Sequence, residues 1–142
     1  MSVDLAKFEL LEELSEEQRE ALGDALSEST LEPDQALFHC RDEASELHLI
    51  CEGGVRLELN GRELGELHAG ESLGAASLAI VGNRQCDAYA IGKTRLFTLT
   101  RTAYLCLCSD TPSVALALQE GVLRAFAGFL RCTVSDRRDS PL

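Results

Sequence analysis

Short segments in which apolar and polar residues alternate fill residues 36 to 100. A period of two predicts strands with one buried and one exposed face. Turn residues separate the segments, and Asn60-Gly61 suits a two-residue type I′ hairpin because both central residues take positive φ. Strands at this short spacing indicate a folded-over antiparallel sheet. The segments are ALFH, ELHLICE, VRLELN, ELGELH, CDAYAI and RLFTLT, and the other turn signals are Gly53-Gly54, Ala69-Gly70 and Gly82-Asn83.

Helical sequence patterns flank these segments on both sides. Ser15, with Gln18 three residues later, is typical of a capping box at a helix start, and DLAKFELLEEL before it is a shorter helical piece. After Pro33 the period changes, and helical spacing returns at Thr102, with Pro112 dividing two helices. The fold class is therefore mainly β (α+β): an antiparallel β-roll or jelly-roll-like barrel with N-terminal helices and a C-terminal helix pair. We expect a single domain over residues 1–132 and a flexible tail over residues 133–142.

The last predicted helix, residues 112 to 132, carries more apolar surface than one contact needs. One line of leucines repeats every seven residues, and a second apolar line runs beside it. The helix therefore has a second partner, which is either a flanking helix of its own domain or the same helix of another subunit. The latter alternative predicts a homodimer through the C-terminal helix. The first line is Leu116, Leu123 and Leu130, and the second is Leu118, Val122, Phe126 and Phe129.

Charge and hydropathy narrow the classes of partner. The chain of 142 residues has a net charge of −11, and residues 1 to 32 contain ten acidic residues against Lys7 and Arg19. Binding to DNA or RNA requires Lys and Arg at the phosphates, so we expect no nucleic acid partner. No apolar run is long enough to span a bilayer, and the acidic N-terminus does not resemble a secretion signal. We therefore expect no membrane contact and a cytoplasmic location.

The six cysteines predict neither a metal site nor a disulfide framework. Cys106 and Cys108 are two apart in a predicted helix, where they face apart, and the other four stand alone in the sequence. His48 and Cys51, three apart on a predicted strand, point to opposite faces. No nucleophile, base and acid occur at a plausible spacing. We expect no metal, no cofactor and no enzymatic activity, and a chain that ends after its last helix leaves no helix-turn-helix for DNA.

The stretch AGESLGAASLAIVGNRQCDAYA, residues 69 to 90, has the features of an anion cradle. Its glycine at position 74 permits close backbone approach, and the free amides of the three residues that follow open a short helix that favours an anion. The arginine can make a charge-assisted fork to phosphate oxygens. The candidate phosphate-binding residues are Gly74, Ala75, Ala76, Ser77, Arg84 and Gln85.

The order of these motifs resembles the cyclic nucleotide-binding domain family over roughly residues 8 to 130. The resemblance is carried by LEPDQALFHCRDEASELHLICEGGVRLELNGRELGELHAGESLGAASL, and it places Leu73-Gly74-Ala75 and Asn83-Arg84-Gln85-Cys86 at the family's F-G-E and P-R-A-A motifs. In that family the glutamate accepts a hydrogen bond from the ribose 2′-hydroxyl, which Ala75 cannot do. Such a bond is worth about 1.5–3 kcal/mol, so its loss weakens a cyclic nucleotide about ten- to a hundredfold or more. Gln85 and Asn83 are further departures from the family's motif.

Two functions remain open from the sequence. The first is a non-enzymatic regulatory module, a sensor that binds a cyclic nucleotide weakly, or another phosphate-bearing small molecule, and reports through its C-terminal helices. The second is a degenerate cyclic nucleotide-binding fold that serves as a protein–protein interaction module through its acidic N-terminal and apolar C-terminal helices. Arg84 and the amides of residues 75–77 favour the sensor, whereas Ala75 counts against ordinary cAMP or cGMP.

Overall fold

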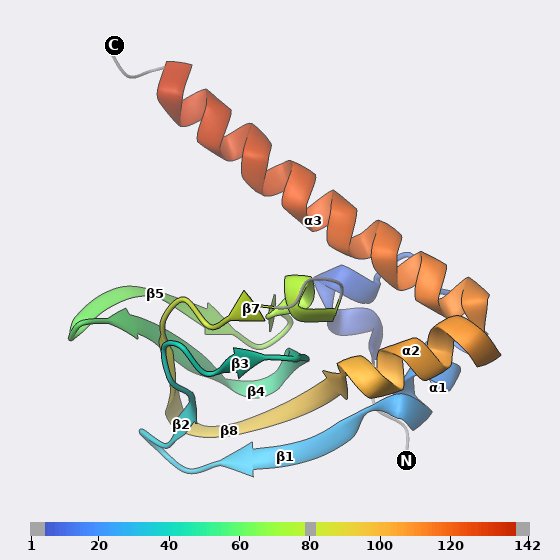
Figure 1. The fold of residues 1–142 in the computed structure, drawn as a ribbon, viewed down its shortest axis with the longest axis horizontal. Coiled ribbons are helices and arrows are strands. Elements are labelled where there is room, and N and C mark those ends of the chain that lie inside the picture. Colours follow the sequence, from blue (N-terminus) through green and yellow to red (C-terminus); the bar gives the residue numbers. More distant parts are fainter. Residues whose placement is uncertain (1–4, 79–81, 139–142) are drawn as a thin grey trace.

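The computed structural model describes residues 5–78 and 82–138, the side chains of Ala76 and of residues 126–138 excepted. A six-stranded antiparallel sheet and a two-stranded ladder form the body (Figure 1). The strand order in the larger sheet is β1-β8-β4-β5, with β2 beside β8 and β6 beside β4, while β3 pairs with β7. The predicted antiparallel β-roll is confirmed. Its strands are β1 (Ser27–Leu31), β2 (Ala36–Phe38), β3 (Glu43–Ala44), β4 (Glu46–Leu59), β5 (Arg62–His68), β6 (Ser72–Leu73), β7 (Gly82–Asn83) and β8 (Asp87–Thr100).

The two longest strands, β4 and β8, pair from end to end and bend together. Their register shifts on both sides of Glu52. The turn predicted at Gly53-Gly54 is wrong, because both glycines lie within β4. Gly53 has φ +83°, and a Cβ at this position would lie 2.6 Å from the carbonyl oxygen of Lys93 in β8. The glycine therefore forms a bulge, which lets the paired strands curve into a roll.

Two of the four predicted turns are present. Asn60 and Gly61 join β4 to β5 with φ values of 54° and 79°, as a type I′ hairpin requires. Ala69 and Gly70 form the turn between β5 and β6. Gly82-Asn83 was predicted as a turn but forms β7 instead, because its backbone pairs with β3. A local turn signal is thus overridden where a partner strand is available.

The N-terminal segment folds as two 3-10 turns followed by one α-helix. The turns η1 (Leu5–Lys7) and η2 (Glu9–Leu11) stand where the shorter helical piece was expected, and α1 (Glu16–Ala25) follows them. The capping box is confirmed: the Ser15 hydroxyl accepts from the Gln18 amide, and the Gln18 side chain accepts from the Ser15 amide. The start of α1 could therefore be read from the sequence alone.

Two helices follow β8. The first, α2 (Arg101–Asp110), begins after Thr100, whose side chain accepts from the Ala103 amide, and α3 (Pro112–Arg138) begins at the proline that divides the pair. The helix α3 continues past residue 132 into residues 133–138, which were predicted to belong to the tail. The sequence there has no glycine or proline before Pro141, so nothing in it stops the helix. A domain boundary at residue 132 stays a prediction.

Two buried clusters form the core of the described residues. One fills the inside of the roll, and the other joins the end of the sheet to the helices, so sheet and helices fold as one unit. No helix within residues 5–78 and 82–138 is long and apolar enough to cross a bilayer. The roll cluster contains Leu31, Ile50, Val55, Ala88, Ala90 and Leu96, and the helix-side cluster includes Leu11, Leu22, Leu47, Leu99, Leu107 and Leu118.

The helix α3 packs on the body with only one of its two apolar lines. Leu118 is 1% exposed and Val122 packs against the same core cluster. Leu116 and Leu123, seven residues apart in the other line, are 56% and 66% exposed. The first partner of the helix is therefore its own domain, and Leu116 and Leu123 of the first line remain uncovered in the monomer.

Gly121 sets how closely α3 approaches the N-terminal segment. A Cβ at this position would collide with the carbonyl oxygen of Leu10 in η2, so only glycine permits the contact. Beyond this point α3 projects away from the sheet (Figure 1). Phe126, Phe129 and Leu130, which complete the two predicted apolar lines, lie outside the residues whose side chains are described.

Replacement of Gly53 by alanine tests the role of the bulge. We expect Gly53→Ala to lower the free energy of unfolding by about 3 kcal/mol, because it adds left-handed strain and a clash with β8. Gly61→Ala is the matched control, since Gly61 has φ +79° but open space around its Cβ position, and it should cost only about 1–2 kcal/mol. Urea denaturation of both variants measures the difference. Equal losses would contradict a specific role for the bulge.

Candidate functional site

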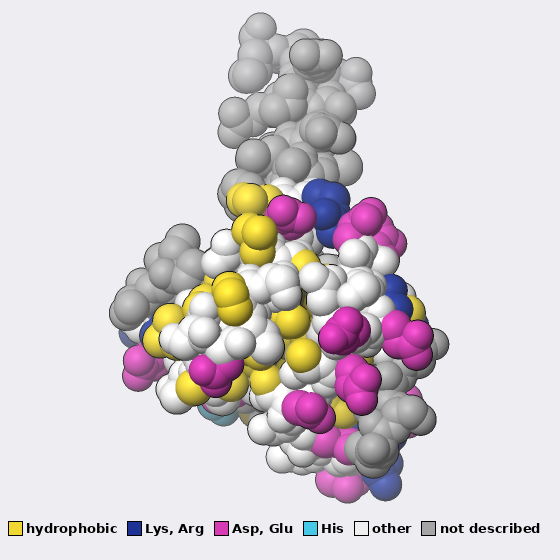
Figure 2. Space-filling view, turned by 90° about the vertical axis from the view of Figure 1, so that its right-hand side faces the viewer, with side chains coloured by type: hydrophobic (Ala, Val, Ile, Leu, Met, Phe, Trp, Pro, Cys, Tyr) yellow, Lys and Arg dark blue, Asp and Glu magenta, His cyan; other side chains and the backbone are white. Residues whose placement is uncertain are grey.

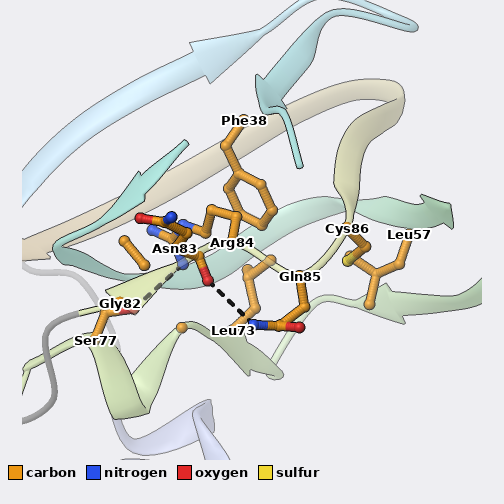
Figure 3. Close-up of a pocket in the computed structure, with 11 residues that line it drawn as sticks. Phe38, Leu57, Leu73, Ser77, Gly82, Asn83, Arg84, Gln85 and Cys86 are labelled. Atoms are coloured by element: carbon orange, nitrogen blue, oxygen red, sulfur yellow. Dashed lines mark hydrogen bonds between the residues drawn. The ribbon is translucent and has the colours of Figure 1, made fainter. Parts of the chain in front are cut away.

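A cavity of about 430 Å³ lies beside the short helix η3 (Ala75–Leu78) and strand β7 (Figure 3). The fold brings four of the predicted site residues to its wall: Gly74, Ser77, Arg84 and Gln85. Ala75 instead packs against the helix-side core cluster. The remaining lining residues are Phe38, Ala44, Leu57, Leu73, Gly82, Asn83 and Cys86.

Arg84 is the only charged residue among those that line the cavity, and it is 9% exposed. Its guanidinium carbon lies 4.2 Å from the centre of the Phe38 ring, beside which it is drawn in Figure 3. Nη2 donates to the Glu46 carbonyl oxygen at 3.1 Å, and Nη1 donates to the Ser77 hydroxyl at 3.5 Å. Nε is buried without a hydrogen-bond partner in the described part of the chain, where no carboxylate forms an ion pair with Arg84. Its direct partners are therefore neutral.

The charge of this arginine persists despite its burial. Burial lowers the pKa of Arg84 from its ordinary value, and the nearby Glu46, Cys86 and Asp42 act in the opposite direction. An arginine side chain nevertheless stays protonated at neutral pH. The cavity thus contains a permanent positive charge. The neighbouring groups accept hydrogen bonds from only some of the guanidinium N–H groups.

Gly74 and η3 place backbone beside this charge. Gly74 has φ +83°, and a Cβ there would lie 2.6 Å from both Arg84 Nη1 and the Glu46 carbonyl oxygen. The prediction that the Ser77 amide is free is wrong, because it donates to the Gly74 carbonyl oxygen at 3.0 Å in the 3-10 turn. Of the three predicted amides, those of Ala75 and Ala76 stay candidates for anion contact.

Gln85 lines the cavity, but its side chain bonds within its own segment. This residue is exposed, and its Nε2 donates to the Asn83 carbonyl oxygen at 3.5 Å (Figure 3). The side chain therefore bonds to its own segment and leaves Arg84 accessible from the cavity.

His48, which sequence reasoning did not connect with the site, stacks on the aromatic ring that Arg84 contacts. Its ring is 6.3 Å from the Phe38 ring in a stacked arrangement, and Nδ1 lies 2.9 Å from the Thr98 hydroxyl. Burial first, and then the positive charge of Arg84, lower the pKa of His48 from 6.5 to about 4. At neutral pH the imidazole is uncharged, so His48 adds no second positive charge near Arg84.

Arg101, at the start of α2, is a second residue that sequence reasoning missed. Its Nε and Nη2 donate to the Ser77 carbonyl oxygen at 3.0 and 2.6 Å, and Nη2 also donates to the Ala44 carbonyl oxygen at 2.9 Å. Its amide donates to the Ser45 carbonyl oxygen at 2.9 Å. One side chain therefore ties η3 and the segment before β4 to the first turn of α2.

The sequence matches the cyclic nucleotide-binding domain family over residues 28–111, which is more than half of the chain. This protein therefore belongs to the cyclic nucleotide-binding domain family, and the resemblance seen in the sequence is confirmed. The fold is that of the regulatory domains of this family. In the part of the chain that is described, no group of three His, Cys, Asp or Glu side chains is placed to hold a metal ion.

Solved structures agree with this assignment. The N-terminal domain of a transcriptional regulator from Streptomyces coelicolor A3(2) has a TM-score of 0.78 and 29% identity, with 92% of this chain and 95% of that one covered. The Catabolite Activator Protein of Thermus thermophilus has a TM-score of 0.78 and 27% identity, and the match covers 92% of this chain but only 62% of that protein. A cyclic nucleotide-binding domain from Methylobacillus flagellatus KT has a TM-score of 0.81 at 20% identity, over 97% and 80% of the two chains. No curated protein matches the sequence.

The lowered pKa of His48 predicts how stability depends on pH. Between pH 6.5 and about 4, the unfolded chain binds a proton at this residue and the folded chain does not. The free energy of unfolding should therefore decrease as the pH is lowered through this window, by about 2 kcal/mol from pH 7 to pH 5 from His48 alone. In His48→Gln, the decrease in the free energy of unfolding between pH 7 and pH 5, measured by urea denaturation, should be smaller than in the unmodified protein by about 2 kcal/mol. A pH dependence unchanged in His48→Gln would contradict the assignment.

Proposed function

We propose that this protein is a non-enzymatic regulatory module that binds the phosphate group of a small molecule in the cavity at Arg84. The observation that carries the proposal is a buried, permanently charged arginine that has only neutral partners and an unpartnered Nε. An unpaired charge in a protein interior costs several kcal/mol. A bound anion would offset this cost, because it would accept hydrogen bonds from the guanidinium in a site with little competing water.

The ligand class follows from what surrounds the arginine. Glycine at position 74 supports the proposal, since it keeps the backbone of the cradle open toward Nη1. Phe38, Leu57 and Leu73 provide an apolar wall for the rest of the ligand. Because Ala75 lacks the carboxylate that the family uses on the ribose 2′-hydroxyl, we infer that ordinary cAMP and cGMP bind weakly and that the physiological ligand is a modified cyclic nucleotide or another phosphate-bearing molecule.

The contacts of Arg101 suggest how binding is reported. A ligand at the cavity would press on η3, and Arg101 fastens the carbonyl oxygen of Ser77 in η3 to the first turn of α2. We infer that α2 and α3 move in response, and that this movement is the output of the module. The net charge of −11 disfavours direct contact of these residues with nucleic acid, and a cytoplasmic location stays a prediction.

Binding measurements on a matched series test the ligand site. We expect calorimetry to show weak or undetectable binding of cAMP to the unmodified protein and about ten- to a hundredfold tighter binding to Ala75→Glu, through the restored hydrogen bond. Ala75→Gln, similar in size but without the charge, should gain less. Arg84→Ala should abolish binding in every background, including that of cyclic dinucleotides.

The same series can overturn the sensor. If Gln85 can turn into the phosphate position, Ala75→Glu alone has no effect and only the double change with Gln85→Ala restores binding. Failure of the double variant to bind any cyclic nucleotide, with an unchanged circular dichroism spectrum, would mean that the cradle is a structural relic.

A second role, in self-association, is favoured by the uncovered line on α3. Leu116 and Leu123 lie on one face of this helix, and Leu105 on α2 is 57% exposed. Figure 2 shows hydrophobic side chains gathered on the face below the point where α3 leaves the body, with acidic side chains to one side of them. We propose that a second copy of α3 covers this line, because heptad spacing is what paired helices require.

Light scattering tests self-association. Leu123→Glu should lower the molecular mass to that of a monomer, because it places a charge in the apolar line that would be buried between the two copies of α3. Leu64→Glu is the control, since Leu64 is similarly exposed at 54% but lies on β5, and it should leave the mass unchanged. A monomer in the unmodified protein at high concentration would contradict the proposal.

A further inference from the structure

Two cysteines, Cys40 and Cys86, lie on neighbouring segments beside the cavity, in the gap between two ladders. On one side of the gap Phe38 of β2 is the partner of Ala88 in β8, and on the other Glu43 of β3 is the partner of Asn83 in β7. Within the gap the chain leaves the strands, with Cys40 in a turn and Cys86 in a bend, and the Cys40 amide donates to Oδ1 of Asp87, the residue after Cys86, at 2.7 Å. Two backbone bonds also join these segments: the Arg84 amide donates to the Asp42 carbonyl oxygen at 2.7 Å, and the Arg41 amide donates to the Arg84 carbonyl oxygen at 2.9 Å.

Both cysteines lie near the cavity and are accessible. Cys86 lines the cavity, and Cys40 is two residues from Phe38, which also lines it. A disulfide spans Cα atoms about 4.4–6.8 Å apart, so it can form only between directly neighbouring segments, as these two are. Both cysteines are free thiols and half-buried, so small reagents can reach them.

The electrostatics of Cys86 agree with a neighbouring thiol. Burial first, then Cys40 and Asp87, raise the pKa of Cys86 above its ordinary value, while Arg84 acts in the opposite direction. Because the thiolate is the reactive form, oxidation that involves Cys86 should quicken as the pH rises.

We propose that Cys40 and Cys86 are a redox-active pair, which a low-molecular-weight disulfide oxidises reversibly to an intramolecular disulfide at the rim of the cavity. One protein thiolate attacks a sulfur of the reagent, breaks its S–S bond and releases one small thiol, which leaves a mixed disulfide. The second protein thiolate attacks the protein sulfur of that mixed disulfide and releases the second small thiol. The two protein thiols lose two electrons, and their two protons end on the released small thiols.

The disulfide would add a covalent bond between two segments that now meet through hydrogen bonds and a contact of His39 with Asp87. The turn from His39 to Asp42, closed by a hydrogen bond of 3.0 Å, carries Cys40, and the segment of Arg84 carries Cys86. The Arg41 amide donates to the Arg84 carbonyl oxygen at 2.9 Å, so the crosslink would lie next to the backbone that holds the arginine. The inference depends on the packing of these two segments and not on a ligand, so it stands or falls separately from the proposed function.

The test is oxidation of the folded protein with glutathione disulfide, followed by peptide mapping in a mass spectrometer. We expect a Cys40–Cys86 crosslink, a melting temperature raised by roughly 5 °C or more, and full reversal by dithiothreitol. Cys40→Ser and Cys86→Ser should each abolish the crosslink and the shift. Cys106→Ser, which changes an exposed cysteine on α2, should retain both.

Three results would overturn the pair: stable glutathione adducts on Cys40 or Cys86, crosslinks of either residue to another cysteine, or free thiols at both positions. The mapping of the unmodified protein decides between these outcomes even if a serine variant folds poorly.

Discussion

The roll depends on the pairing of β4 with β8. These strands share the longest ladder, and every other strand of the larger sheet pairs with one of them. Thr94, with no exposed surface, binds both the amide and the carbonyl oxygen of Gly54 at the bend, at 3.3 and 2.9 Å. These bonds satisfy backbone groups that the bulge would otherwise leave unpaired inside the protein. The curvature set there brings the segments before β4 and before β8 around one cavity.

The buried arginine imposes the second constraint. Its flat face rests on Phe38, and its edge contacts Glu46 and Ser77, so three separate segments must adopt their positions together. Gly74 is required because any side chain would displace the guanidinium. A structural arginine would normally be given a carboxylate partner, and the described residues place none in ion-pairing contact with it. This absence supports the proposed binding of an external anion at Arg84.

Local signals in the sequence were sufficient for β2, β4, β5 and β8, the capping box at Ser15 and the hairpin at Asn60-Gly61, because each depends on neighbours within a few residues. They missed β1, which precedes Pro33, where the strand pattern was expected to begin. They failed at Gly53-Gly54 and Gly82-Asn83, where pairing with a distant strand decides the backbone. The residues of the site were likewise predicted only in part. The cradle was visible as a motif. The stacking of His48 on Phe38, 10 residues earlier, and the bonds of Arg101 to residues 24 and 57 positions earlier arise from tertiary contacts, for which a single sequence holds no signal.

Two arginines hold the same pair of segments, and this limits how a ligand can act. Arg84 bonds to Glu46 and to the side chain of Ser77, while Arg101 bonds to Ala44 and to the backbone of Ser77. An anion that draws the Arg84 guanidinium toward itself weakens only the first set. The bonds of Arg101 would then transmit any displacement of η3 to α2, because Arg101 is the first residue of that helix. The displacement must either break the bonds of Arg101 to the Ala44 and Ser77 carbonyl oxygens or rotate α2. Rotation costs less than leaving buried carbonyl oxygens unpaired, so a ligand at the cavity should act on α2 before it acts on the rest of the fold.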